Sequence, residues 1–96
     1  MNHDRMRTDL LSVAMQLANL HGFGNVTRDM IANRAEVAVG TISYHFGTMK
    51  KLEAAMVERA IETSNMRVLG QALAKRHPKA LAAPEGVRKA AALAMV

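Results

Sequence analysis

The side chains in this sequence that could contact a charged partner gather between residues 39 and 51. The segment opens with the small residues Val39, Gly40 and Thr41, so a helix that begins here can approach another surface closely. Hydroxyl, imidazole and ammonium groups follow, and all of these donate hydrogen bonds to phosphate oxygens. They are Thr41, Ser43, Tyr44, His45, Thr48, Lys50 and Lys51. The segment therefore favours contact with a phosphate-bearing partner.

The same residue types do not make a catalytic or metal site. The sequence has no cysteine, which excludes disulfides, a thiol nucleophile and cysteine-ligated zinc. The histidines have no metal-ligand spacing. Ser43 and His45 form no nucleophile–base pair, because positions two apart on a helix face different ways. We expect no enzyme activity, no metal and no cofactor.

The composition fits a small protein with an acidic partner. The chain has 96 residues, of which 50% are hydrophobic, enough for one compact domain or one domain with an arm. Its net charge of +5 suggests nucleic acid or an anionic membrane as partner, and leaves open a merely soluble basic protein. The N-terminus lacks the apolar stretch of a signal peptide, and no apolar run approaches the roughly 18 residues of a membrane span.

Helical periodicity predicts the elements that position the segment. Apolar residues recur every three or four positions over 6–20, which predicts a first helix. Thr27 is suited to cap a second helix. A third helix is predicted over 39–46, where Ile42 and Phe46 lie one turn apart on a buried face.

The second half of the chain also predicts helices. Gly47 ends the third helix, and Thr48 can cap the next. An apolar stripe over 52–73 predicts one long fourth helix. Pro84 and Glu85 open a short alanine-rich helix, with proline at its first position. No strand is expected, because β-branched residues never run in alternation.

Two short helices joined by a tight turn predict a helix-turn-helix motif. The expected fold class is all-α: a three-helix helix-turn-helix DNA-binding bundle, over 1–50, and then a long fourth helix and a short C-terminal helix, over 51–96. In this motif the second helix enters the major groove with its N-terminal residues at the base edges, which assigns base contact to Val39, Gly40 and Thr41. The remaining candidates for DNA contact are Thr27, Arg28, Ser43, Tyr44, His45, Thr48, Lys50 and Lys51.

For several of these residues a purely structural role stays open. Thr27 caps a helix whatever else it binds, Tyr44 could be half-buried packing, and His45 could be a core histidine. The lysines could form an ordinary solvated face. Arg5 and Arg7 could reach a minor groove, although we expect a disordered arm here.

From about Thr8 to Glu58 the chain resembles the DNA-binding domain of the TetR/AcrR family of bacterial transcription regulators. The matching pieces are "LLSVAMQLANLHGFGNVT", "IANRAEV", "GTISYHF" and "KKL". The resemblance implies a homodimer that binds a palindromic operator. It implies phosphate contact by Thr27, Tyr44 and His45, and base reading around positions 39–41.

The chain departs from the family pattern at four positions. Glu36 stands where the family usually has a turn glycine, and Ala38 where it has a serine cap. Ser43 replaces the most typical tyrosine, and Met49 replaces the usual lysine at the start of helix four. With these departures, either phosphate contact is weaker than is usual in the family, or it is moved to Arg28, Lys50 and Lys51.

The resemblance also implies a large helical C-terminal domain with an effector pocket and a dimer interface. Only about 40 residues follow the motif, and we expect them not to enclose a pocket of about 300–1,000 Å³ in one subunit. A small-molecule effector is therefore not expected, whether the chain is a natural short regulator or the front of a longer one. The expected dimer seam comprises Met56, Ile61, Val68, Leu69, Leu73, Val87 and Leu93.

Two functional hypotheses follow. The first is a sequence-specific transcriptional regulator in the cytoplasm of a bacterium, encoded there or by a phage, which binds operator DNA as a homodimer. Repression is favoured, although the sequence does not separate a repressor from an activator. The second is an interaction module that pairs with a related regulator and blocks it, with weak or no DNA binding.

Overall fold

The computed structural model describes residues 3–95, and within this range it is built of helices with no strand. The elements are α1 (His3–His21), the 3₁₀ helix η1 (Phe23–Asn25), α2 (Arg28–Ala35), α3 (Val39–Phe46), α4 (Met49–Glu62), α5 (Met66–Ala74), α6 (Pro78–Leu81) and α7 (Glu85–Ala94). The predicted all-α class is therefore confirmed. None of these helices combines the length and the apolar character needed to cross a membrane.

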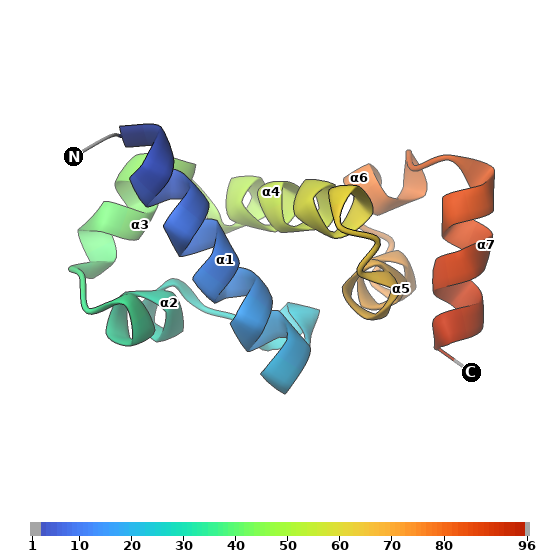
Figure 1. The fold of residues 1–96 in the computed structure, drawn as a ribbon, viewed down its shortest axis with the longest axis horizontal. Helices are drawn as coiled ribbons and strands as arrows, with labels where there is room; N and C mark the ends of the chain where they lie inside the picture. Colours follow the sequence, from blue (N-terminus) through green and yellow to red (C-terminus); the bar gives the residue numbers. More distant parts are fainter. Residues whose placement is uncertain (1–2, 96) are drawn as a thin grey trace.

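The molecule is elongated, with principal extents of 38 × 23 × 19 Å. Helices α1, α2 and α3 form one end, and α5, α6 and α7 form the other (Figure 1). Helix α4 runs between the two ends and packs against members of both groups. The candidate segment on α3 therefore lies far from the C-terminal helix α7.

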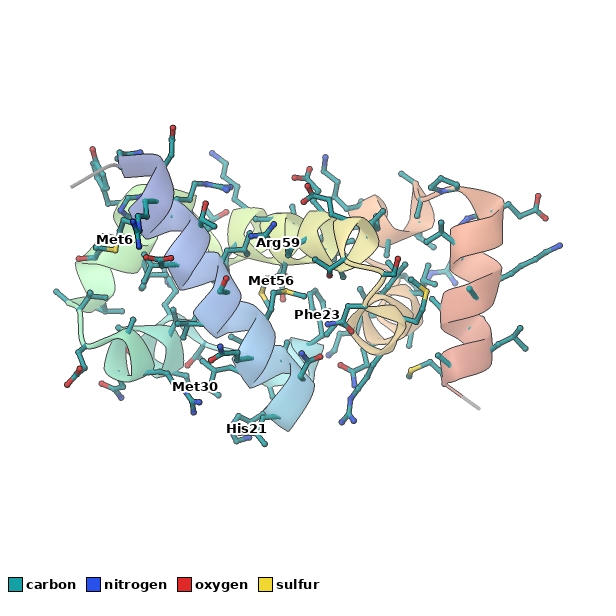
Figure 2. All side chains as sticks on the ribbon, viewed as in Figure 1. Met6, His21, Phe23, Met30, Met56 and Arg59 are labelled. Carbon is teal, nitrogen blue, oxygen red and sulfur yellow. The ribbon has the colours of Figure 1, made fainter. Side chains whose placement is uncertain are left out.

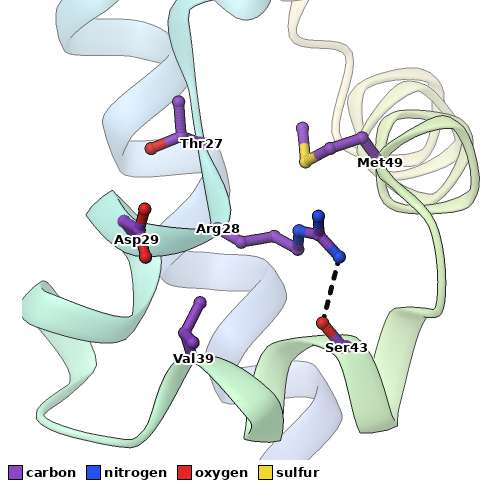
Figure 3. Close-up of a pocket in the computed structure, with 6 residues that line it drawn as sticks. All are labelled: Thr27, Arg28, Asp29, Val39, Ser43 and Met49. Carbon is purple, nitrogen blue, oxygen red and sulfur yellow. Dashed lines mark hydrogen bonds between the residues drawn. The ribbon is translucent and has the colours of Figure 1, made fainter.

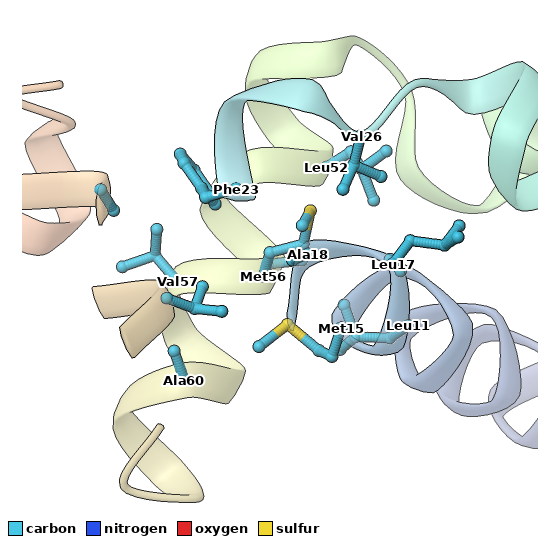
Figure 4. Close-up of a cluster of buried hydrophobic side chains, with 14 of the residues drawn as sticks. Leu11, Met15, Leu17, Ala18, Phe23, Val26, Leu52, Met56, Val57 and Ala60 are labelled. Atoms are coloured by element: carbon cyan, nitrogen blue, oxygen red, sulfur yellow. The ribbon is translucent and has the colours of Figure 1, made fainter. Parts of the chain in front are cut away.

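One buried hydrophobic cluster joins the two ends. It takes residues from every helix from α1 to α7, so it crosses the boundary placed between residues 50 and 51. Phe23 is 2% exposed and lies with Met56 in the middle of the molecule, between α1 and α5 (Figures 2 and 4). Burial of such large side chains contributes about 1.5–3 kcal/mol each. The core thus fixes α4 relative to the first three helices.

The predicted long fourth helix is wrong, because the chain makes two helices there. Helix α4 ends at Glu62, and Ser64 takes a left-handed backbone conformation with φ 55°, which is uncommon for a residue other than glycine. Asn65 then caps α5, its side-chain oxygen accepting the Val68 N–H at 3.1 Å. The turn lets α5 fold back onto α4, and a continuous helix would carry its apolar stripe into solvent.

The C-terminal region differs from the prediction in two details. Pro84 is the cap residue of α7 and not its first helical position. A further short helix, α6, precedes it, and His77 caps α6 by accepting the Lys79 N–H on Nδ1 at 3.2 Å. The sequence did contain a local signal for the start of α6, because Pro78 follows the cap residue His77 at the first position of this helix.

The expected disordered N-terminal arm is also wrong over the described residues. Arg5 and Arg7 belong to α1, which begins at His3. The Arg7 guanidinium lies 4.9 Å from the centroid of the Phe46 ring, a cation–π arrangement between α1 and α3. This contact explains why the first turn of α1 is held against α3.

Three residues of the predicted dimer seam belong to the core of the single chain. Met56, Val68 and Leu69 are fully buried, because α5 packs between α4 and α7. Their side chains have no surface left for a second copy in this structure. The other seam residues keep exposed surface, partly for Ile61, Leu73 and Val87 and to 74% for Leu93.

Candidate nucleic-acid interface

The turn between α2 and α3 is shaped by backbone hydrogen bonds more than by side-chain caps. Thr27 caps α2 as predicted, its hydroxyl oxygen accepting the Met30 N–H at 3.2 Å. Glu36 ends α2 in the left-handed region, with φ 58° and ψ 45°. Ala38 starts α3 with no side-chain cap bond. The geometry is that of a helix-turn-helix, made with a non-glycine turn residue that costs about 1–2 kcal/mol.

Helix α3 has one face in the core and one face free. Ile42 and Phe46 are 0% and 5% exposed, as their spacing predicted. Val39 and Tyr44 are 45% and 74% exposed, and Gly40 is open as well. The start of α3 therefore presents its smallest residues outward, where a partner can come close to the helix backbone.

A surface groove of about 380 Å³ lies beside this free face, between the starts of α2, α3 and α4 (Figure 3). Four of the residues that line it were predicted to contact DNA: Thr27, Arg28, Val39 and Ser43. Two others, Asp29 and Met49, were not. The fold thus brings residues 16 positions apart in the chain to one surface.

Arg28 and Ser43 are paired across the groove. The Arg28 guanidinium donates a hydrogen bond from Nη1 to the Ser43 hydroxyl oxygen at 3.0 Å (Figure 3). Ser43 is thereby used to hold Arg28 toward α3, and four other guanidinium N–H groups stay available to acceptors. The sequence alone did not show this pairing, because it depends on how α2 and α3 cross.

The start of α4 adds positive charge near α3. Thr48 caps α4 as predicted and accepts the Lys51 N–H at 3.2 Å. Lys50 and Lys51 are exposed, and neither forms an ion pair with a carboxylate among residues 3–95. Lys50 does not line the groove beside Arg28 but a second pocket, on the side of η1 and α6.

A cluster of rings covers the C-terminal half of α3. His3 from α1 lies 4.5 Å from the His45 ring and 5.4 Å from the Tyr44 ring, measured between centroids. The Nδ1 atom of His45 is buried without a hydrogen-bond partner. Burial lowers the pKa of His45 below its ordinary value, and the nearby His3 and Arg7 lower this pKa further. His45 is therefore favoured in its neutral form, and only its Nε2 can reach a phosphate.

The predicted set divides into three groups in space. Val39, Gly40 and Tyr44 lie on the free face of α3, while Thr41 and His45 are half-buried at its flanks. Thr27, Arg28 and Ser43 belong to the groove, and Thr48, Lys50 and Lys51 belong to the start of α4. Sequence reasoning missed His3, Asp29 and Met49, and it assigned Arg7 to a disordered arm. Only Asp29 and Met49 had a sequence signal, since each adjoins a predicted site residue.

Comparison with known families gave one match. Residues 10–56 match the family described as bacterial regulatory proteins of the tetR family. This segment covers α2, α3, the groove and the first half of α4. The family is a regulatory DNA-binding family and not an enzyme family. Comparisons with curated proteins and with solved structures found no match.

Proposed function

Residues 10–56 form a helix-turn-helix DNA-binding domain of the tetR family, and from this premise we propose that the chain is a sequence-specific repressor. It binds a palindromic operator as a homodimer in the bacterial cytoplasm, and it represses by occupying the promoter. The observation that carries the proposal is the free face of α3, which presents Val39, Gly40 and Tyr44 beside the groove at Thr27 and Arg28.

The dimensions of α3 suit the major groove. An α-helix with its side chains is about 10–12 Å in diameter, and the major groove of B-DNA is about 12 Å wide, so the groove admits a helix such as α3. The methyl groups of Val39 and Thr41 suit thymine C5-methyl groups, and the Thr41 hydroxyl can bond a base or a phosphate. Gly40 lets the helix backbone come close at the point between them.

The residues around α3 supply the phosphate contacts. Arg28 is positioned by Ser43 and carries free guanidinium donors. Lys50 and Lys51 have no carboxylate partner among the described residues, so their charge is available to a DNA strand. Asp29 in the groove carries the opposite charge, and we expect it to face away from the phosphates or to accept from a cytosine amino group.

The second end of the molecule supports a homodimer. The exposed Leu93 and the half-buried Leu73 and Val87 lie on α5 and α7, away from α3. A copy that packs on this end leaves both α3 helices free to bind DNA. Two-fold symmetry of the protein then matches the symmetry of a palindromic operator.

The test is binding of the full chain to DNA from the upstream region of its own gene, compared with a shuffled fragment at two salt concentrations. We expect a clear preference for the native fragment that persists at the higher salt. Footprinting then gives the operator. Equal binding to both fragments that is lost at the higher salt contradicts sequence-specific recognition, because only the charge then acts.

Two variants separate base contact from phosphate contact. Thr41→Ala should relax the preference at one position in each half-site. Lys51→Ala should weaken binding to all sequences and lower the salt slope by about one unit. Lys89→Ala on α7 is the matched control, because it removes an exposed lysine from the opposite end of the molecule. Unchanged base preference for Thr41→Ala would remove Thr41 from the base-reading set.

The partner-blocking hypothesis rests on the left-handed Glu36 and the uncapped Ala38, which make α3 costlier to form. It predicts no saturable binding to either fragment. A pull-down with a full-length regulator of the same family from the same genome then decides it.

A further inference from the structure

A second pocket of about 410 Å³ lies between η1, the start of α4 and the turn from α5 to α6. Its volume falls in the range of small-molecule sites. From the sequence, the residues after the motif are expected not to enclose a ligand pocket by themselves. The structure forms it jointly from both halves of the chain. It shares no lining residue with the groove beside α3.

Positive charge dominates this pocket. Lys50, Lys75 and Arg76 line it, and none of them forms an ion pair with a carboxylate within residues 3–95. Lys79 also lines the pocket, but its Nζ is 2.7 Å from Glu58 Oε1. Glu53 is the one acidic residue of the lining. Three unpaired cations against one carboxylate leave an excess of two charges, which matches a dianion.

The turn from α5 to α6 carries two of these cations, Lys75 and Arg76, on a backbone fixed by hydrogen bonds. Arg76 takes a left-handed backbone with φ 58°, a conformation that is unfavourable for a side chain of this size. Its N–H donates to Leu73 O at 2.8 Å, and the His77 N–H donates to Ala72 O at 3.0 Å. The Lys75 ammonium end lies over Gly24, in space that a Cβ would fill. The fold thus fixes the backbone from which both cationic side chains extend.

The pocket also has an apolar side. The buried Phe23 borders it, and its ring lies nearly at right angles to the His77 ring, with 6.0 Å between the centroids and an angle of 89°. Ala54 and Pro78 continue the apolar lining. A bare phosphate uses the cations alone, whereas a ligand with an apolar group uses both sides of the pocket.

We propose that this pocket binds a small organic phosphate monoester. Its dianionic head lies among Lys50, Lys75 and Arg76, and its apolar group lies against Ala54 and Pro78, beside the largely buried Phe23 ring. A phosphate monoester is largely dianionic at pH 7, since its second pKa is about 6. Arginine and lysine are the residues that bind such groups.

Binding here has a consequence for DNA, which rests on the function proposed above. Lys50 belongs both to this pocket and to the predicted DNA contacts at the start of α4. A dianion beside Lys50 competes with DNA phosphate for the same charge. The ligand should therefore weaken operator binding, by about fivefold or more if the coupling is typical, and DNA should weaken ligand binding by the same factor.

The first test needs no DNA. The full chain, labelled with ¹⁵N, is titrated with phenyl phosphate, inorganic phosphate and phenol, and amide shifts are followed by NMR. We expect phenyl phosphate to bind at least tenfold more tightly than either fragment. The shifts should centre on residues 23, 50 and 75–79. Equal affinity for phenyl phosphate and inorganic phosphate would overturn the proposal, and it would leave the DNA-binding function untouched.

Variants of the turn make the test specific. Arg76→Asn removes the charge and keeps a residue that tolerates a left-handed backbone, so the fold is retained. It should weaken phenyl phosphate binding at least tenfold, and Lys75→Gln should do the same. Arg67→Gln is the matched control, because it removes an exposed arginine of α5 outside this lining. Equal loss in Arg67→Gln would mean a general charge effect and would overturn the site.

A second arm separates a small ligand from DNA itself. Without ligand, Arg76→Asn should bind the operator fragment as wild type does. Phenyl phosphate should lower the operator affinity of wild type and not that of Arg76→Asn. If Arg76→Asn alone weakens operator binding, the pocket holds a DNA phosphate and the small-ligand proposal is wrong.

Discussion

At the residue scale, Gly40 is the position on the free face of α3 that has no side chain to cover the helix backbone. A Cβ built there meets nothing within 4 Å, so the protein itself has no packing need for glycine at this site. A helical glycine costs stability relative to alanine, which makes its presence here unfavourable for the fold alone. Close approach of DNA would explain it.

Gly40→Ala should therefore stabilise the protein and weaken DNA binding. We expect a gain of about 0.5–1 kcal/mol in the free energy of unfolding, measured with urea. Operator affinity should fall about tenfold or more, since overpacking an interface by a methyl group costs on the order of 1–3 kcal/mol. Fluorescence anisotropy with labelled operator measures the second effect.

Gly86→Ala is the control for this substitution. Gly86 holds the same position in α7 as Gly40 holds in α3, and its Cβ would also meet open space. It should stabilise the protein similarly and leave operator binding unchanged. If Gly40→Ala binds the operator as tightly as Gly86→Ala, α3 does not approach DNA at this residue.

His45 gives the folding stability a pH dependence. Burial, His3 and Arg7 lower the pKa of His45 in the folded protein, whereas the unfolded chain keeps a value of about 6.5. Between these two pKa values the unfolded chain binds more protons, so the free energy of unfolding falls as the pH drops below about 6.5. Above that pH the imidazole is neutral in both states, so protonation of His45 no longer lowers the free energy of unfolding.

The comparison of wild type with His45→Gln isolates the part of the pH dependence of stability that comes from His45. Urea unfolding between pH 7.5 and pH 5 should show a smaller loss of stability in His45→Gln than in wild type. His21→Gln removes an exposed histidine and serves as the control for loss of an imidazole. The same pH slope in wild type and His45→Gln would contradict the lowered pKa.

At the element scale, the helices are delimited by local signals and positioned by packing. Thr27, Thr48 and Asn65 each cap a helix with a side-chain oxygen. Helix α3 has no such cap and follows a strained Glu36, yet it forms because Ile42 and Phe46 are buried. Packing thus offsets a local sequence that does not favour the start of this helix.

Helix α7 docks on α5 at Gly70, which is buried. A Cβ there would lie 2.9 Å from the backbone oxygen of Ala91 and 2.6 Å from Met95 Cγ. The methionine can move, but the backbone of α7 can yield only if the helix shifts. Gly70 is therefore the point of closest approach between these two helices, and not merely a weak point within one helix.

Gly70→Ala should destabilise the protein, in contrast to the other two helical glycines. We expect a loss of about 1–3 kcal/mol from overpacking, reduced by the better helix propensity of alanine, which is worth about 1 kcal/mol. Urea unfolding gives the net value, and amide exchange in α7 should speed up. A gain in stability like that of Gly86→Ala would mean that α7 does not rest against α5 here.

At the scale of the whole molecule, α3 and α7 occupy opposite ends of a body 38 Å long (Figure 1). A dimer joined through α5 and α7 holds its two α3 helices apart on the outside. Half-sites on DNA must then be separated by about 34–36 Å or a multiple of it. The operator spacing found by footprinting thus reports the angle between the two copies.

Leu93→Glu tests whether this end forms the dimer. Leu93 is 74% exposed, so the substitution should change the stability of one chain by less than about 0.5 kcal/mol. It should raise the dimer dissociation constant at least about tenfold, because a charge would be buried without a partner. Sedimentation velocity over a range of concentrations measures this constant.

Leu20→Glu on α1 is the matched control, since Leu20 is a leucine with 64% exposure that belongs to neither α5 nor α7. It should leave the dissociation constant unchanged. A dimer that survives Leu93→Glu and is lost in Leu20→Glu would move the interface to α1.

The sequence by itself determined the all-α class, the second and third helices and the two faces of α3, but not the break between α4 and α5 or the short helix α6. Caps, proline, glycine and the spacing of apolar residues act over a few positions, so they can be recognised without the fold. The buried Ile42 and Phe46 and the capping Thr27 and Thr48 follow from such patterns, whereas the left-handed backbone of Glu36 does not. The family match rests on the same stretch of chain.

Only the tertiary structure decided which helix packs against each apolar face. Periodicity shows that Met56, Val68 and Leu69 share an apolar stripe, but the turn at Ser64 folds that stripe into the core. The Arg28–Ser43 pair and the contact of His3 with His45 join residues 15 and 42 positions apart. The cationic pocket joins residues from η1 to α6. Such sites depend on how the helices cross, because a sequence pattern fixes a residue's own helix face and not the neighbour that it meets.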